Sequence, residues 1–405
     1  MTARAARTAS ARTACARTAR PTRARIIATA VVLAVLPALV GTPAAAHDSS
    51  VRLDFLGERE LPNALAFQGT TVGGLSAIGY DARTGAYYVI SDDRSATGPA
   101  RFYTADIDFA HGALKSVELT GTHPWLRPDG TTFPPTSTTT STVAPDPEGI
   151  AVDPRKGGLV WTSEGERIVP SGGQALLGDP WIRRATTTGA YAGQLPLPPQ
   201  LHMNSQEFGP RQNQTLEGVT FTPDGRRIVT AMEDPLYQDG ADPTPEHGAL
   251  TRITVHDADT GLPTAQYAYP LEPLFAAPPA GSTDTNGVSD IVALGHDRFL
   301  VLERASIYAD NNWKSRIYLV DLRGATDVLG RDSLTTASAR PVKPVRKTLV
   351  TDLSDVPGLT RVDNVEGITL GPRLPDGRRT VVLVSDDNFA ARQVTQVIAF
   401  AAHGI

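Results

Sequence analysis

From residue 74 onward, short apolar runs alternate with turn sequences along almost the whole chain. One clear example is residues 361–388, which read RVDNVEGITLGPRLPDGRRTVVLVSDDN. An apolar run, a Pro-Asp-Gly turn and a second apolar run follow one another there, and this order predicts two strands paired in a hairpin. Both open ends of the predicted hairpin carry a carboxylate, from Glu366 and from Asp386.

The same hairpin pattern occurs five times, with the other copies at residues 74–93, 148–166, 217–234 and 288–304. The aligned first residues, which are 69 to 77 positions apart, are Ser76, Glu148, Glu217, Ser289 and Glu366. The residues that we align at the end of the second run are Asp92, Glu164, Glu233, Glu303 and Asp386. Similarity at a period of this length indicates a repeat architecture.

Each copy is followed by a third strand-like run, and the first four copies also have a fourth. Four short antiparallel strands per repeat, with almost no helical periodicity, are typical of a β-propeller blade. We therefore predict an all-β fold, a β-propeller of five four-stranded blades. Six blades, with one degenerate blade hidden in the loops, is the alternative. The run SVRLDFL at residues 50–56 is expected to complete the last blade and close the ring, which would remove exposed sheet edges.

The first 46 residues have a different composition from the rest of the chain. Seven arginines and no acidic residue precede an apolar run over residues 26–40, and the small-residue sequence Ala44-Ala45-Ala46 follows. This order predicts a secretory signal peptide over residues 1–46, cleaved near Ala46, and hence a secreted protein. A membrane anchor is the alternative, but the apolar run is shorter than the roughly 20 residues that a span needs. We expect residues 47–405 to form a single domain.

Cysteine usage and charge narrow the class of function. Cys15 is the only cysteine and lies in the predicted signal, so thiol chemistry and disulfides are not expected in the mature chain. Without residues 1–46 the chain has 31 basic and 43 acidic residues, a formal net charge of −12. Such an acidic surface argues against nucleic acid or an anionic membrane as the partner. We expect a monomer without a membrane span that takes a small-molecule substrate.

The propeller prediction brings the repeated carboxylates together. The first strand of a blade lines the central channel, and the second strand runs antiparallel beside it. The start of the first strand and the end of the second therefore lie on the same face of the propeller. Glu148, Glu217 and Glu366 should therefore surround one mouth of the channel. A second ring just outside them should be formed by Asp92, Glu164, Glu233, Glu303 and Asp386.

The negative charge of so many acidic side chains at one mouth must be neutralised by bound protons, by basic groups or by a cation. Arg94, Arg304 and Arg361 lie beside the predicted rings and are candidate partners. Oxygen ligands of this kind favour Ca²⁺ or Mg²⁺, and the histidines show no spacing that indicates zinc. The competing interpretation is that these acids only cap neighbouring blades by accepting hydrogen bonds from backbone N–H groups.

Several of these stretches in one order resemble a known family. They are GLSAI with YYVISDDR, DPEGIAV with WTSEGE, NQTLEGVTF with MEDPL, FLVLERAS with RIYLVDL, and NVEGITL with VLVSDDNF. Together they span about residues 70–390 and resemble the secreted bacterial phytase-like family, described by the esterase-like activity of phytase. The resemblance implies a β-propeller and a phosphoesterase or carboxylesterase activity, with calcium as the implied cofactor.

The residues and the resemblance together give a functional hypothesis, a metal-assisted hydrolase of a phosphate or carboxylic ester. In this hypothesis Glu148, Glu217 and Glu366 are the catalytic bases or inner ligands, and the five acids of the second ring hold calcium. The groups expected to contact the substrate anion are Arg94, Arg304 and Lys314. The first alternative is a non-catalytic, calcium-dependent binding propeller at the cell envelope, and the second is a scaffold that calcium merely stabilises.

Overall fold

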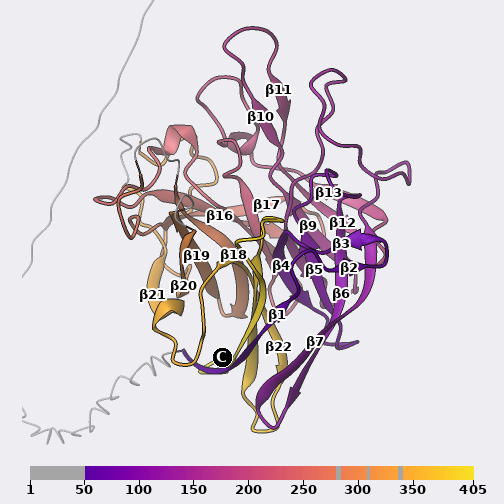
Figure 1. Ribbon diagram of the computed structural model, residues 1–405. Coiled ribbons are helices and arrows are strands. Elements are labelled where there is room, and N and C mark those ends of the chain that lie inside the picture. Colours follow the sequence, from indigo (N-terminus) through magenta and orange to yellow (C-terminus); the bar gives the residue numbers. More distant parts are fainter. Residues whose placement is uncertain (1–50, 280–283, 308–310, 336–340) are drawn as a thin grey trace, which may run out of the picture. The chain divides into compact units, whose positions relative to one another are not determined.

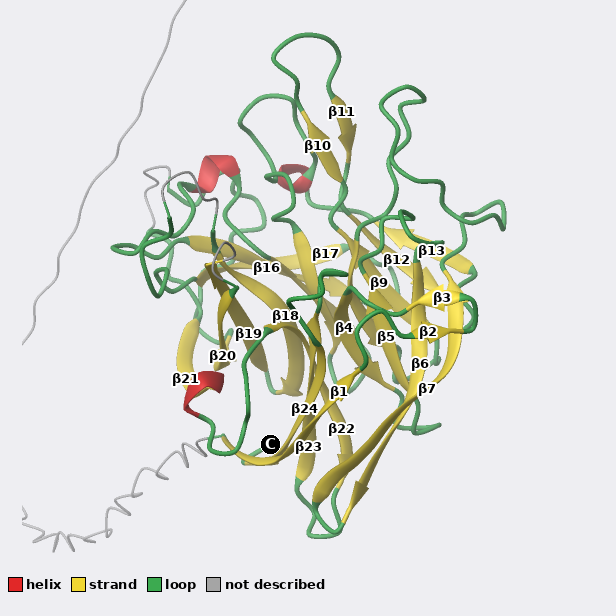
Figure 2. Ribbon diagram, viewed as in Figure 1, coloured by secondary structure: helices red, strands yellow, loops and turns green. Residues whose placement is uncertain are grey.

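β-Strands make up nearly all of the regular structure, as the predominance of arrows in Figure 2 shows. The computed structural model describes residues 51–279, 284–307, 311–335 and 341–405 (Figure 1). The predicted signal peptide and its cleavage site lie outside these residues. None of the helices in the described ranges has the length and apolar character that crossing a membrane requires.

Five four-stranded antiparallel sheets follow one another along the chain. Blade 1 contains β4 (Leu75–Tyr80), β5 (Tyr87–Ser91), β6 (Arg101–Ala110) and β7 (Ala113–Pro124). Blade 2 contains β8 (Pro147–Val152), β9 (Leu159–Ser163), β12 (Trp181–Ala185) and β13 (Tyr191–Leu195). Blade 3 contains β14 (Leu216–Phe221), β15 (Arg227–Met232), β16 (Leu250–Asp257) and β17 (Pro263–Pro270).

The last two blades follow the same order. Blade 4 contains β18 (Asn286–Gly295), β19 (Arg298–Ile307), β20 (Asn312–Asp321) and β21 (Arg346–Asp352). Blade 5 contains β22 (Asn364–Arg373), β23 (Arg379–Asp386), β24 (Thr395–His403) and, as its outer strand, β1 (Arg52–Leu61). β1 pairs antiparallel with β24, from Arg52 opposite His403 to Leu61 opposite Thr395. The N-terminal strand thus closes the ring, as the sequence predicted.

Smaller elements decorate the blades. The hairpin of β10 (Glu166–Ile168) and β11 (Leu176–Gly178) is inserted between the second and third strands of blade 2 and projects away from the sheets (Figure 1). A second small hairpin pairs β2 (Ala66–Phe67) with β3 (Thr70–Thr71). Short 3-10 turns are η1 (Pro199–Leu201), η2 (Tyr237–Asp239) and η4 (Leu353–Asp355).

The inner strands form a closed ring. Neighbouring inner strands contact one another in the order β4, β8, β14, β18, β22 and back to β4. The prediction of a five-bladed β-propeller is confirmed, and the described residues contain no sixth blade.

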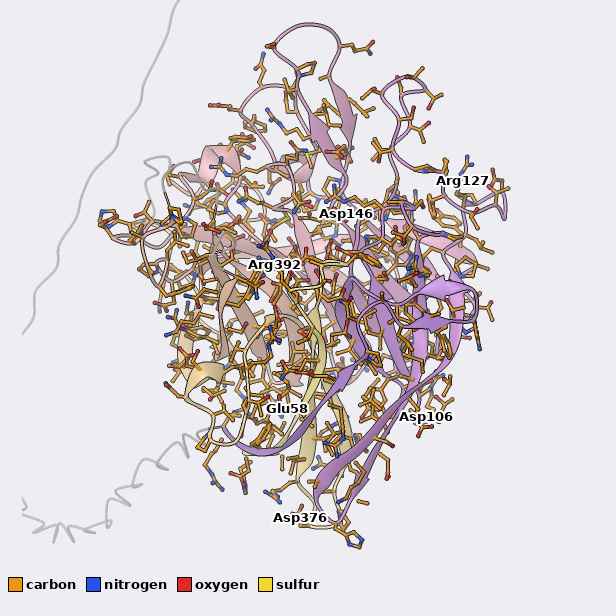
Figure 3. The ribbon with its side chains drawn as sticks, in the orientation of Figure 1. Glu58, Asp106, Arg127, Asp146, Asp376 and Arg392 are labelled. Atoms are coloured by element: carbon orange, nitrogen blue, oxygen red, sulfur yellow. The ribbon has the colours of Figure 1, made fainter. Side chains whose placement is uncertain are left out.

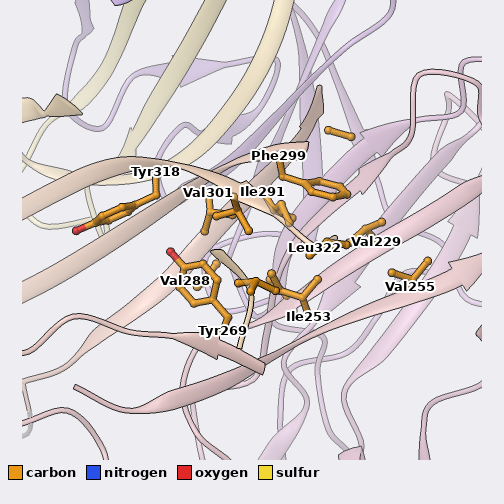
Figure 4. Packing of buried hydrophobic residues seen from close by; sticks show 14 of the residues in the cluster. Val229, Ile253, Val255, Tyr269, Val288, Ile291, Phe299, Val301, Tyr318 and Leu322 are labelled. Atoms are coloured by element: carbon orange, nitrogen blue, oxygen red, sulfur yellow. The ribbon is translucent and has the colours of Figure 1, made fainter. Parts of the chain in front are cut away.

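Hydrophobic cores lie between neighbouring blades. Between blades 3 and 4, Val229 and Ile253 pack with Ile291, Phe299 and Val301, all of which are at most 1 % exposed (Figure 4). Corresponding clusters join each of the other four pairs of neighbouring blades. Because both faces of a blade are covered in this way, its inner strands read as nearly continuous apolar runs.

Each inner strand carries a register shift near its start, at the residue aligned in the sequence repeat. The residues at these bulges are Ser76, Glu148, Glu217, Ser289 and Glu366. A bulge redirects a side chain locally and is common beside functional sites. The glycine after each glutamate has a packing role, since a Cβ on Gly149 would lie 2.3 Å from the carbonyl oxygen of Glu217 in the next blade. The inner strands are therefore nearly in contact, and the carboxylates gather at the mouth.

Candidate functional site at the acidic mouth of the propeller

A cavity of about 1230 Å³ opens at the end of the ring where the bulges lie, and residues of all five blades contribute to it. Arg167 of the β10–β11 hairpin also lines it. In Figure 3, Asp146 lies at the base of this projecting hairpin, whereas Asp376 lies at the tip of the β22–β23 hairpin at the far end of the sheets. The open ends of the repeated hairpins therefore share one face, as predicted.

The three predicted inner carboxylates line this cavity and are almost fully buried. Glu148 is 8 % exposed, Glu217 5 % and Glu366 7 %. Burial raises the pKa of Glu148 and of Glu217 well above the usual value, and the charges of the neighbouring carboxylates raise it further. Burial also raises the pKa of Glu366, although the positive charge of Arg304 opposes this shift.

Four of the five acids predicted for the second ring are brought to the same place. Asp92, Glu233 and Asp386 line the cavity, and the carboxylate of Glu164 lies within 4.8 Å of those of Glu217 and Glu233. Glu233 is 3 % exposed, and burial raises its pKa to about 8 even though the nearby Arg304 lowers it.

Glu303, the fifth predicted member, is directed elsewhere, because the alignment of the fourth hairpin was displaced by one residue. In the strand register, Glu303 lies opposite Val288 in the same way that Met232 lies opposite Leu216. Glu303 is therefore equivalent to Met232, and the next residue, Arg304, is equivalent to Glu233. Side chains alternate between the two faces of a strand, so a shift of one residue places the side chain on the opposite face.

The contacts of Glu303 lie among β-strands, outside the cavity lining. Its Oε1 accepts a hydrogen bond of 2.7 Å from the Tyr269 hydroxyl, its Oε2 accepts one of 3.0 Å from Asn286 Nδ2, and Lys347 also pairs with it. Lys314, predicted to contact substrate, likewise lies outside the lining, with its Nζ 3.0 Å from Asp352 Oδ2. Neither residue is placed to serve the predicted site.

Arg304 and Arg94 supply the positive charge of the mouth. Arg304 Nη2 lies 3.0 Å from Glu233 Oε1 and 3.1 Å from Glu366 Oε1, and its side chain is 12 % exposed. Arg94 pairs with Asp146 and hydrogen-bonds to Asn213. Burial opposes the charged form of both arginines, but the surrounding carboxylates raise the pKa of each. Arg361, also considered as a partner, instead pairs with Asp363 at 2.7 Å.

Sequence reasoning missed two residues that lie two positions before the inner glutamates, and one of them, Asn364, lines the cavity. Asp146 precedes Glu148, and Asn364 precedes Glu366, donating from Nδ2 to Glu366 Oε1 at 2.9 Å. Residues two apart on a strand lie on the same face, so this spacing was a signal in the sequence. Asp234, next to Glu233, was also missed. Burial raises its pKa to about 7, although it accepts a 2.6 Å hydrogen bond from Thr285 Oγ1.

A stacked group on the cavity wall was not predicted at all. Two guanidinium groups lie over the ring of Tyr237, with Arg167 Cζ at 4.8 Å and Arg211 Cζ at 4.4 Å from its centroid. Cation–π contacts of this kind hold both arginines at the wall. The three residues come from segments far apart in the chain, so no local pattern in the sequence indicates the stack.

Carboxyl groups outnumber guanidinium groups in the cavity. Eight carboxylates and four guanidinium groups belong to the residues that line it. Among the residues that the structure describes, two groups of carboxylates offer oxygens within 4.8 Å of one another, Asp146 with Glu148 and Glu164, and Glu164 with Glu217 and Glu233. Closely spaced carboxylate oxygens are the ligands that Ca²⁺ and Mg²⁺ prefer, so the residues fit a hard divalent cation.

Comparison with known proteins gives a family for the chain. Two of the solved structures to which the chain is similar are an endo-arabinase from Bacteroides thetaiotaomicron and a β-1,3-galactosidase. The first is 10 % identical with a TM-score of 0.41, over 81 % of this chain and 93 % of that one. The second is also 10 % identical with a TM-score of 0.41, over 84 % and 94 %. Such low similarity says nothing about the substrate of this chain.

No curated protein matches the chain. Residues 70–389, more than three quarters of the sequence, match the sequence model described as "Phytase-like: Esterase-like activity of phytase". The chain therefore belongs to the phytase-like family.

Proposed function

We propose that the protein is a metal-assisted ester hydrolase that acts on a small-molecule phosphate or carboxylic ester at the acidic mouth of the propeller. One observation carries the proposal, the convergence of three buried glutamates on a cavity that Arg94 and Arg304 also line. Membership of the phytase-like family supports hydrolysis as the class of reaction.

The glutamates are suited to proton transfer. A carboxyl group with a raised pKa keeps its proton near neutral pH, whereas an ionised neighbour can accept one. Burial and mutual repulsion raise the pKa values of Glu148 and Glu217 in this way. We assign the roles of general acid and general base to Glu148 and Glu366, and Glu217 would act as an ionised base or as an inner ligand of a cation. Arg94 and Arg304 would hold the anionic group of the substrate, since a guanidinium pairs well with phosphate or carboxylate oxygens.

A divalent cation, with Ca²⁺ as our first choice, would be held by Glu164, Glu217 and Glu233, whose carboxylate oxygens lie within 4.8 Å of one another. When bound, such an ion supplies polarisation of an ester oxygen and lowers the pKa of a coordinated water. Asp92 and Asp386 are further candidate ligands on the other side of the cavity. We also propose that the mature protein is secreted and monomeric, with residues 1–46 as its signal peptide.

Hydrolysis of p-nitrophenyl phosphate and of p-nitrophenyl acetate, each with and without a chelator, tests the proposal. We expect metal-dependent turnover of at least one ester. The double variant Glu217→Gln, Glu366→Gln should lower kcat/KM by at least about tenfold, because it removes one proton-transfer group and one group that serves as a base or as a ligand of the cation. Glu118→Gln on the outer strand β7 is the matched control and should leave kcat/KM unchanged. A loss of less than tenfold in the double variant would remove these glutamates from the reaction.

The second candidate function is a non-catalytic, calcium-dependent binding propeller. The surplus of carboxylates in the cavity favours it, because such a surface would also hold a ligand that carries positive charge. No turnover across a panel of esters, together with a melting temperature that rises with calcium, would support this function over the first.

A further inference from the structure

The β10–β11 hairpin and the segment beside it carry exposed apolar side chains. Among the described residues, the exposed large apolar side chains are Val169, Leu177, Phe208, Leu262 and Leu349. Val169 directly follows β10 and Leu177 lies in β11, so both belong to the hairpin that projects away from the sheets (Figure 1). Apolar residues scattered singly over a surface are ordinary, whereas a group of them beside a cavity indicates a binding surface.

The strand register places the two apolar residues of the hairpin on the same face as a residue of the cavity. Arg167, which lines the cavity, lies opposite Leu177 in the antiparallel pair, and Val169 lies two positions after Arg167. Paired residues, and residues two apart along a strand, point to the same face. Leu176, on the other face, is only 9 % exposed. The face with Val169 and Leu177 therefore continues outward from the cavity wall.

Phe208 is held beside this face by backbone hydrogen bonds. Arg167 Nη2 donates to the carbonyl of Gln206 at 3.3 Å, and the N–H of Phe208 donates to the same carbonyl at 2.8 Å. The next residue, Gly209, accepts at 3.1 Å from the N–H of Tyr237, which also lines the cavity. The segment that carries Phe208 is thus fixed between the hairpin and the cavity wall.

The polarity of the cavity differs from that of this outer face. The cavity lining consists almost entirely of charged and polar side chains, so it offers an apolar group few favourable contacts. A phosphate ester of a small polar molecule would in turn make no use of the apolar side chains outside. A substrate that combines a polar reacting group with an apolar chain matches both surfaces at once.

We infer that Val169, Leu177 and Phe208 bind the acyl chain of the substrate, which is a carboxylic ester with an extended apolar chain. The ester group lies in the cavity, while the chain runs outward over the hairpin. The inference rests on the proposed ester hydrolysis and chooses between its two classes of ester. Complete burial of one methylene strengthens binding by about fourfold, and a chain on an open face gains less than this per methylene.

Hydrolysis of p-nitrophenyl acetate, butyrate and octanoate tests the inference. From acetate to octanoate we expect kcat/KM to rise by at least about tenfold, mainly through a lower KM. The double variant Val169→Thr, Leu177→Asn should reduce the ratio of octanoate to acetate turnover by at least about fivefold. Both side chains are exposed, so the variant should fold. Leu262→Asn, which changes a 55 % exposed leucine in the turn between β16 and β17, is the matched control and should keep the wild-type ratio.

Calorimetric binding of octanoate and of acetate separates this inference from the proposed function. If the wild type hydrolyses no ester but binds octanoate at least about tenfold more tightly than acetate, and the double variant does not, the apolar face is supported and hydrolysis is refuted. Equal octanoate-to-acetate ratios in the wild type and the double variant, in turnover and in binding, would overturn the inference. The same holds if the double variant loses only self-association or binding to phosphatidylcholine vesicles, because the face then serves a second copy or a membrane.

Discussion

Acidification from about pH 8 to about pH 5.5 should stabilise the metal-free protein through Glu233. This glutamate is 3 % exposed, and burial raises its pKa from 4.5 to about 8 although Arg304 Nη2 lies 3.0 Å from Oε1. A carboxyl group whose pKa is raised by folding contributes stability that is complete below its unfolded pKa. This contribution is lost as the pH rises through the folded pKa.

The size of the effect follows from the two pKa values. Between about pH 8 and about pH 5.5 the folded state takes up the proton of Glu233, whereas the unfolded state, with a pKa of 4.5, remains mostly ionised. Each pKa unit corresponds to about 1.4 kcal/mol, so the free energy of unfolding should increase by about 3 kcal/mol from this group. Other groups also titrate in this range, so the contribution of Glu233 must be isolated by a variant.

Glu233→Gln isolates the contribution, because glutamine keeps the shape of the side chain but does not titrate. Urea unfolding in the presence of a chelator, followed by circular dichroism at both pH values, gives the free energy of unfolding of each protein. The wild type should gain about 3 kcal/mol more than Glu233→Gln on acidification. Parallel pH dependences in the two proteins would refute the reasoning, since they would mean that Glu233 is ionised at about pH 8 at no cost.

Two further predictions concern packing and a buried histidine. Gly149→Ala should lower the free energy of unfolding by about 1–3 kcal/mol, because the added Cβ would lie 2.3 Å from a carbonyl oxygen of blade 3. Gly172→Ala, where a Cβ meets nothing within 4 Å, is the control, and equal melting temperatures of the two variants would contradict the prediction. Burial lowers the pKa of His256 from 6.5 to about 4. As the pH falls through this range, this histidine takes up a proton in the unfolded state before it does so in the folded state, so the free energy of unfolding should fall by about 3 kcal/mol. His256→Gln should reduce this loss in urea unfolding, and an unchanged loss would contradict the assignment.

Much of the fold followed from the sequence because local patterns encode it. The short apolar runs and the Gly and Pro turns between them predicted the hairpins, and the repetition of the hairpins predicted five blades. The closing strand was predictable because the fifth repeat lacks an outer strand, and the strand-like run at residues 50–56 belongs to none of the five repeats. The inner residues Glu148, Glu217 and Glu366 were placed correctly at the mouth for the same reason, since each begins a repeat.

The second ring shows the limit of this reasoning. Aligning the fourth hairpin by residue type selects Glu303, whereas the strand register selects Arg304, one residue later. The register depends on the pairing between β18 and β19, which contains two shifts, between Val288 and Asp290 and between Ala293 and Gly295. Sequence alone does not locate such bulges, and each one changes which face a side chain occupies.

The sequence by itself determined the repeat, the strand order and the presence of a carboxylate at the mouth end of most blades. These features depend on neighbours in the chain, so they are visible in its pattern. Tertiary structure alone decided that Arg304 and Arg94 pair with acids of other blades, that Arg167 and Arg211 lie over the ring of Tyr237, and which acceptors remain unpaired. Most of these contacts join residues of neighbouring blades, which lie tens of positions apart in the sequence. Their charge balance depends on distances that exist only when the ring is closed.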